Sequence, residues 1–136
     1  MASFHPSHVM VPNGMGTVYA RVTLRSPDRT VSEVLDLVVD TGSLFTWVPE
    51  QVATRLGVRP GTTRRFRIID GNVVERSVGD CLVECEGEEG YTRIVFGQVG
   101  DASVLGVTAL EALGLQVDPQ THRLQRVDAT LALATP

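Results

Sequence analysis

Lysine is absent from this chain of 136 residues, so all twelve basic residues are arginine. With 16 acidic residues the net charge is −4. The one basic cluster, Arg64, Arg65 and Arg67, is followed closely by Asp70 and Glu75 and has few aromatic residues nearby. Such a mixture is typical of a solvated strand face and does not predict a nucleic-acid-binding surface.

Long hydrophobic runs are also missing. None approaches the ~20 apolar residues that a membrane-spanning helix needs, so we expect no membrane association. Residues 1–14 contain neither a charged segment nor a long apolar segment, and we predict a flexible N-terminal arm instead of a signal peptide. The three histidines, His5, His8 and His122, do not form a metal-binding pattern, so we expect neither a metal nor a cofactor.

Cysteine is scarce, with only Cys81 and Cys85 in the chain. In an extended strand their Cα atoms would lie about 13 Å apart, because each residue advances the chain by about 3.3 Å. That separation is too long for a disulfide. Free thiols fit a reducing compartment, so we expect a cytoplasmic protein. No histidine is close in sequence, and neither thiol is expected to be a catalytic nucleophile.

Short β-like runs separated by turn residues dominate what is present. The length fits one domain, expected over residues 15–128. The expected strands cover residues 16–25, 31–39, 64–70, 73–79, 80–86, 91–97, 115–118 and 122–127. Asp70-Gly71 between apolar runs predicts one hairpin, and residues 87–90, GEEG, predict a second hairpin with an acidic, solvated tip.

Two short helices complete the predicted fold. The first covers residues 49–56, with Gly57 just past its end. The second follows Thr108, which has the spacing of a capping box with Glu111, and stops at Gly114. The chain is therefore predicted to be all-β with two short helices.

The strand expected over residues 31–39 finishes with the apolar run Leu37-Val38-Val39 and ends on a carboxylate at Asp40, which Thr41 and Gly42 follow. A buried and unpaired charge is costly, so this position needs an explanation. One interpretation is a structural turn, in which Asp and Thr bond the nearby backbone. The other is an acid placed for chemistry.

With its context this segment resembles the active-site segment of the aspartic proteases. Residues 40–49, DTGSLFTWVP, are similar to the pepsin-like enzymes, whereas the order and length of residues 16–127 resemble the retroviral-type (retropepsin-like) proteases. A second matching motif is Val104-Leu105-Gly106, a hydrophobic-hydrophobic-Gly sequence before a helix. The resemblance implies a closed, barrel-like acid-protease fold with one lobe per chain.

Proteolysis by an activated water needs both a base and an acid, and two carboxylates ~3 Å apart provide both because they share one proton. This chain has a single Asp-Thr-Gly and is too short for two lobes. The second carboxylate must then be Asp40 of an identical chain, since a two-fold axis places the same residue of each subunit together. We therefore predict a homodimeric aspartic endopeptidase acting on extended peptides with apolar side chains.

The resemblance also implies roles for the neighbouring residues. Thr41 would tie the two active-site loops together across the dimer axis, and Gly42 would let the backbone approach the carboxylates. The Ser43 hydroxyl has two possible roles: it donates a hydrogen bond to the ionised carboxylate, or it only caps the turn. Val104, Leu105 and Gly106 would support the loop from beneath.

The predicted flap is the tip of the first hairpin, formed by Ile69, Asp70, Gly71, Asn72 and Val73. Retroviral flaps are richer in glycine, so a plain surface hairpin is the alternative. Trp47 is interpreted as core in preference to a substrate-binding subsite.

Residues 129–136 suit either an interface strand between two chains or a tail. Two other functions stay open. One is a catalytically weak retropepsin-like module for dimerisation or peptide binding. The other is a small β-barrel binding protein in which Asp-Thr-Gly is accidental.

Overall fold

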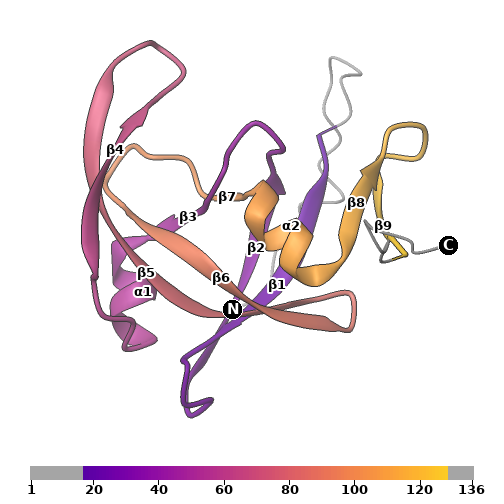
Figure 1. The fold of residues 1–136 in the computed structure, drawn as a ribbon, viewed down its shortest axis with the longest axis horizontal. Coiled ribbons are helices and arrows are strands. Elements are labelled where there is room, and N and C mark those ends of the chain that lie inside the picture. The colour runs from indigo at the N-terminus through magenta and orange to yellow at the C-terminus, as the bar shows by residue number, and fades with distance from the viewer. Residues whose placement is uncertain (1–16, 129–136) are drawn as a thin grey trace, which may run out of the picture.

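The computed structural model describes residues 17–128. The predicted N-terminal arm, residues 1–14, and the predicted interface strand or tail, residues 129–136, lie outside the described part. The described residues are mostly β, as predicted, with two short helices (Figure 1). The elements are β1 (Tyr19–Arg25), β2 (Ser32–Val39), β3 (Thr46–Pro49), α1 (Glu50–Arg55), β4 (Thr62–Arg67), β5 (Val73–Cys85), β6 (Glu88–Gly97), β7 (Val104–Leu105), α2 (Val107–Leu113), β8 (Leu115–Asp118) and β9 (Arg123–Arg126).

Seven strands form one sheet in the order β1-β2-β7-β3-β6-β5-β4, and β1 pairs additionally with β5. The strands β8 and β9 form a separate two-stranded sheet. Figure 1 shows this small sheet and the β4–β5 hairpin at opposite sides of the molecule, with α2 between them.

The strand β5 is continuous over 13 residues, so the predicted division into strands 73–79 and 80–86 is wrong. Val78 is in register with Thr62 of β4 and also with Val95 of β6, so one strand serves both hairpins. Gly79, at the end of the first of these two predicted strands, permits close packing. A Cβ atom there would lie 2.6 Å from Val58 and 2.7 Å from the carbonyl oxygen of Arg59.

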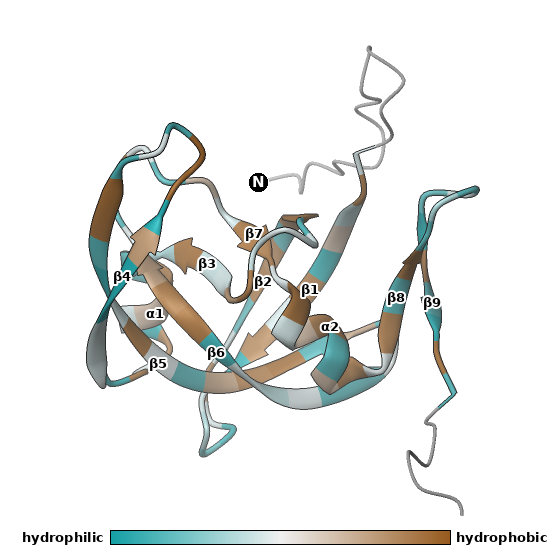
Figure 2. Cartoon of the chain, turned by 45° about the horizontal axis from the view of Figure 1, so that its top comes forward, coloured by the Kyte–Doolittle hydropathy of each residue, from teal (hydrophilic) through white to brown (hydrophobic). Residues whose placement is uncertain are grey.

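Buried apolar residues alternate along the first strand of the core. Val18, Ala20, Val22 and Leu24 are all buried, and Figure 2 shows apolar and polar residues alternating along β1. The helix α2 buries Ala109, Leu110 and Leu113 and packs against β6. Burial of these apolar faces is the main favourable contribution to folding.

The β5–β6 hairpin corrects a second prediction. Its turn is only Glu86-Gly87, both with positive φ, and Glu88 and Glu89 belong to β6. Glu89 pairs with Arg29 at 2.8 Å and Glu88 with Arg126 at 2.7 Å. The predicted four-residue tip is therefore too long, but it is acidic and solvated as predicted, because Glu86 and Glu89 are exposed and Glu88 is half-buried. The sequence did not predict the arginine partners of Glu88 and Glu89.

Cys81 and Cys85 are buried free thiols, which confirms the absence of a disulfide between them. Burial raises the pKa of Cys81 to about 12 and that of Cys85 to about 11. Both thiols are therefore protonated at neutral pH, and the thiolate form that a nucleophile needs is disfavoured. No helix within residues 17–128 has the length and apolarity to cross a membrane.

Candidate active site

The Asp-Thr-Gly loop begins where two adjacent parallel strands end. Val38 and Val39 of β2 are in register with Val104 and Leu105 of β7. The amide of Asp40 extends this ladder by donating to the carbonyl oxygen of Leu105 at 2.9 Å. The Asp40 carboxylate is exposed in the single chain, so the apolar strand delivers it to the surface and not into the core.

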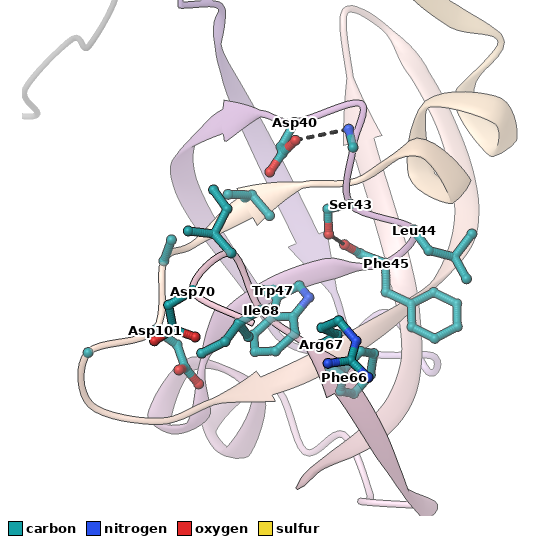
Figure 3. A pocket seen from close by; sticks show the side chains of 15 residues that line it. Asp40, Ser43, Leu44, Phe45, Trp47, Phe66, Arg67, Ile68, Asp70 and Asp101 are labelled. Atoms are coloured by element: carbon teal, nitrogen blue, oxygen red, sulfur yellow. Dashed lines mark hydrogen bonds between the residues drawn. The ribbon is translucent and has the colours of Figure 1, made fainter. Parts of the chain in front are cut away.

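Within the loop the backbone turns back onto the carboxylate. The amide of Gly42 donates to Asp40 Oδ1 at 2.9 Å (Figure 3). A Cβ atom at residue 42 would lie 3.3 Å from that same oxygen, so a side chain there would crowd the acid. The loop therefore presents the carboxylate with a backbone donor already in place.

The Ser43 hydroxyl donates to the carbonyl oxygen of Phe45 at 2.7 Å. A hydroxyl has one proton to donate, so the predicted donation from Ser43 to Asp40 is not made in this chain. The alternative role, capping the turn, is the one that the contacts support.

The segment that follows β7 supports this loop from the other side. The amide of Gly106 donates to Thr46 Oγ1 at 3.0 Å. A Cβ atom at residue 106 would lie 2.2 Å from the carbonyl oxygen of Phe45 and 2.9 Å from that of Ser43. Only glycine fits here. Leu105 and Gly106 thus contact residues 40–46 directly, and the supporting role that the resemblance implies stays a prediction.

The first turn of α2 continues the same support. The amide of Val107 donates to the Ser43 carbonyl oxygen at 2.8 Å. Thr108 donates through both its amide and its hydroxyl to the Leu44 carbonyl oxygen, at 3.0 and 2.8 Å. Because the Thr108 hydroxyl is used in this way and α2 has Gly106 as its N-cap, the predicted capping box with Glu111 is wrong.

A pocket of about 580 Å³ lies between this loop and the β4–β5 hairpin (Figure 3). Its lining comes from three segments that are distant in sequence: the Asp-Thr-Gly loop with β3, the hairpin, and the chain before β7. The residues are Asp40, Gly42, Ser43, Leu44, Phe45, Trp47, Phe66, Arg67, Ile68, Ile69, Asp70, Gly100, Asp101, Ala102 and Val104.

Aromatic rings form the apolar part of the lining. The Trp47 and Phe66 rings meet edge to face with centroids 5.0 Å apart, and Phe45 lies 6.1 Å from Phe66. Trp47 is half-buried, so it both packs against the core and faces the pocket. Sequence reasoning did not identify Phe45 or Phe66, because their contact joins β4 to the segment before β3.

Only some of the predicted flap residues line the pocket. Ile69 and Asp70 line the pocket, whereas Gly71, Asn72 and Val73 do not. Gly71 has φ +90°, which favours glycine, and the Asn72 amide donates to Asp70 Oδ1 at 2.8 Å. The tip is therefore an ordered turn with a fully exposed isoleucine at its end.

Thr41 does not line this pocket but lines a second groove of about 710 Å³. That groove is mostly apolar and includes Leu110 of α2 and Val117 of β8. The loop thus presents Asp40 and Thr41 on different sides, and the role of Thr41 across a dimer axis stays a prediction.

Asp101 is a pocket residue that sequence reasoning missed, and no local signal distinguishes it. Hydrogen bonding to Arg76 holds the pKa of Asp101 below its usual range. Among residues 17–128 no three histidine, cysteine or acidic side chains are grouped closely enough to bind a metal ion. No protein-family model matches the chain, and no curated protein matches it either.

Proposed function

We propose that this chain is one protomer of a homodimeric aspartic endopeptidase, in which water activated by the two Asp40 carboxylates hydrolyses peptide bonds. One observation carries the proposal. The exposed Asp40 carboxylate and the β4–β5 hairpin line the same pocket, and the loop of Asp40 is hydrogen-bonded to the Val104-Leu105-Gly106 segment.

The strand pairings support the retropepsin-like fold that the sequence resembles. β1 pairs with β2 on one side and with β5 on the other. The strands β1, β2, β7, β3, β6 and β5 therefore follow one another in a ring of pairings, as a closed, barrel-like lobe would require. The strand β4 and the separate β8–β9 sheet lie outside this ring.

A second carboxylate from a partner chain is needed because the pocket offers no suitable one. Asp70 accepts hydrogen bonds from the amide and side chain of Asn72, and Asp101 is bound by Arg76. Within the described residues neither is hydrogen-bonded to Asp40. Two copies of Asp40 across a two-fold axis would form the pair that shares one proton and titrates as a unit.

The substrate in this proposal is an extended peptide. The hairpin would cover it and bond its backbone in the manner of an added strand. The aromatic lining of Phe45, Trp47 and Phe66 suits a bulky apolar side chain next to the cleaved bond. The proposed reaction needs no metal or cofactor, because acid and base are both carboxylates.

The direct test compares wild type with Asp40→Asn on a mixture of unstructured peptides between pH 3 and 7. The amide side chain of this variant cannot accept the proton from water, so we expect cleavage to fall at least about 1,000-fold. Glu50→Gln is the matched control, because it also converts an exposed carboxylate to an amide, on α1, and should cleave normally.

Two outcomes would contradict this proposal in different ways. If wild type is a folded dimer that binds peptides but cleaves none, the chain is a retropepsin-like dimerisation or peptide-binding module. If it is a monomer that neither binds nor cleaves peptides, Asp-Thr-Gly is a structural turn in a small β-barrel binding protein.

A further inference from the structure

Two arginines on the inner face of the β4–β5 hairpin contact the body of the domain. Arg64 and Arg76 are directly opposite in the ladder, and opposite residues of an antiparallel pair share a face. The guanidinium of Arg64 lies 5.2 Å from the centre of the Phe45 ring. Arg76 donates to both carboxylate oxygens of Asp101, at 2.7 and 3.0 Å. These two contacts attach the hairpin near its base, and Phe66, nearer the tip, adds the edge-to-face contact with Trp47.

Asp101 also makes two hydrogen bonds to the backbone of Gln98. Its carboxylate accepts a hydrogen bond from the Gln98 amide at 2.7 Å, and its amide donates to the Gln98 carbonyl oxygen at 2.9 Å. This turn leads directly into β7, whose Leu105 carbonyl oxygen accepts the hydrogen bond from the Asp40 amide. The Arg76–Asp101 pair therefore links the hairpin to the strand that holds the Asp40 loop.

Among the ion pairs formed by residues 17–128, this one is the most shielded from water, with side-chain exposures of 17% for Arg76 and 12% for Asp101. A two-point arginine–carboxylate bond fixes geometry as well as energy, and shielding limits its weakening by salt. By contrast, the backbone hydrogen bonds of the tip, from Ile68 to Asn72 and from Gly71 to Ile68, are internal to the tip.

We propose that Arg76 is a positioning residue for substrate binding, because its bond to Asp101 holds the β4–β5 hairpin over the pocket while residues 68–72 remain able to move. This inference rests on the proposed function, since the hairpin acts as a flap only if the pocket takes a peptide. Arg76 acts through Asp101 and needs no contact with the substrate.

The position of the hairpin can be measured without any enzymatic assay. Trp47 is the only tryptophan in the chain, and its ring lies 5.0 Å from Phe66 of β4. For Arg76→Gln we expect acrylamide quenching of Trp47 to rise about twofold. Amide exchange of residues 66–74 should become about tenfold faster, because the hairpin opens more often.

The matched control is Arg55→Gln. Arg55 also makes a two-point bond, to Glu33 at 3.0 and 3.3 Å, but the pair lies outside the pocket lining. This variant should leave quenching and exchange unchanged. If Arg76→Gln behaves as Arg55→Gln does, the proposed role of Arg76 is refuted.

Two further variants separate positioning from general stability. Asp101→Asn breaks the same bond from the other side and should reproduce the effect of Arg76→Gln. The charge-swapped double variant Arg76→Asp with Asp101→Arg restores the ion pair but not the hydrogen bond from the Gln98 amide, so exchange should be slower than in the single variants and faster than in wild type. If both single variants lose the folded state, the pair is structural and the positioning role is refuted.

Kinetics then decide whether the positioning concerns the substrate. With a cleaved peptide we expect KM of Arg76→Gln to rise about tenfold and kcat to change less than about twofold. A fall in kcat with unchanged KM would contradict the proposal. If wild type cleaves nothing while the exchange results are as expected, the proposed protease function fails and the attachment of the hairpin stands.

Discussion

The Asp40 loop and the tip of the β4–β5 hairpin line the same pocket but are held in opposite ways. The loop and the start of β3 are hydrogen-bonded to segments far along the chain, because the Asp40 amide donates to the Leu105 carbonyl oxygen and the Gly106 amide donates to Thr46 Oγ1. The tip, residues 68–72, makes its backbone–backbone hydrogen bonds within itself, and the Gly71 carbonyl oxygen accepts a further one from the adjacent Arg67 side chain. A reacting group needs a fixed position, whereas a cover must open to admit substrate. We therefore propose one rigid and one separable wall of the pocket, which the Arg76–Asp101 ion pair joins.

Gly106→Ala should have the largest effect of the variants that test this contrast between the Asp40 loop and the hairpin tip. The new Cβ atom would lie 2.2 Å from the Phe45 carbonyl oxygen, so the backbone of the loop or of α2 must shift. We expect the free energy of unfolding to fall by about 3 kcal/mol, and cleavage to be lost with the loop geometry. Urea denaturation measures the first effect. A change below about 1 kcal/mol would show that the loop is not rigid.

Thr46→Val tests the polar part of the same support. Thr46 is fully buried, and its hydroxyl accepts the hydrogen bond from the Gly106 amide at 3.0 Å. Valine keeps the shape but leaves a buried amide without a partner, so we expect a loss of about 2 kcal/mol in urea denaturation. Thr46→Ser keeps the hydroxyl and should lose less. Equal losses would mean that packing and not the hydrogen bond matters.

Asp101→Asn tests the link between the Asp40 loop and the hairpin. We expect the free energy of unfolding to fall by about 1.5 kcal/mol at pH 7. Hydrogen bonding to Arg76 lowers the pKa of Asp101 in the folded state, so its contribution is present above the ordinary aspartate pKa. It is lost as pH falls from about 4 through the lowered pKa. Urea midpoints of wild type and variant should therefore converge in that range. A difference that does not change with pH would contradict the link.

Ile69→Ser tests the hairpin tip and should have the smallest effect on stability. The side chain is fully exposed, so we expect the free energy of unfolding to change by less than about 0.5 kcal/mol. Because Ile69 lines the pocket, KM for an apolar peptide should nevertheless rise. A large loss of stability would show that the tip is packed and not separable.

The features that the sequence predicted well are those with local causes. Asp70-Gly71 predicted its hairpin, and Gly57 and Gly114 predicted the two helix ends, because turn and cap chemistry acts over a few residues. The predicted capping box of Thr108 and the predicted donation from Ser43 to Asp40 are wrong. The Thr108 hydroxyl donates to the carbonyl oxygen of residue 44 instead, and the Ser43 hydroxyl donates to that of residue 45.

The missed residues depend on contacts between distant segments. Thr46 and Gly106 are 60 residues apart, and Arg76 and Asp101 are 25 apart. No local pattern identifies such partners in a single sequence. Gly106 was expected to support the loop, but the steric reason, the close Phe45 carbonyl oxygen, required the fold.

The central claim is that one chain carries half of an active centre. It is tested most directly by mixing wild type with Asp40→Asn at constant total concentration, allowing subunits to exchange, and measuring peptide cleavage. If two copies of Asp40 are needed, mixed dimers are inactive and activity falls as the square of the wild-type fraction, to about one quarter in an equal mixture. A linear fall, to about one half, would show that each chain works alone and would contradict the account.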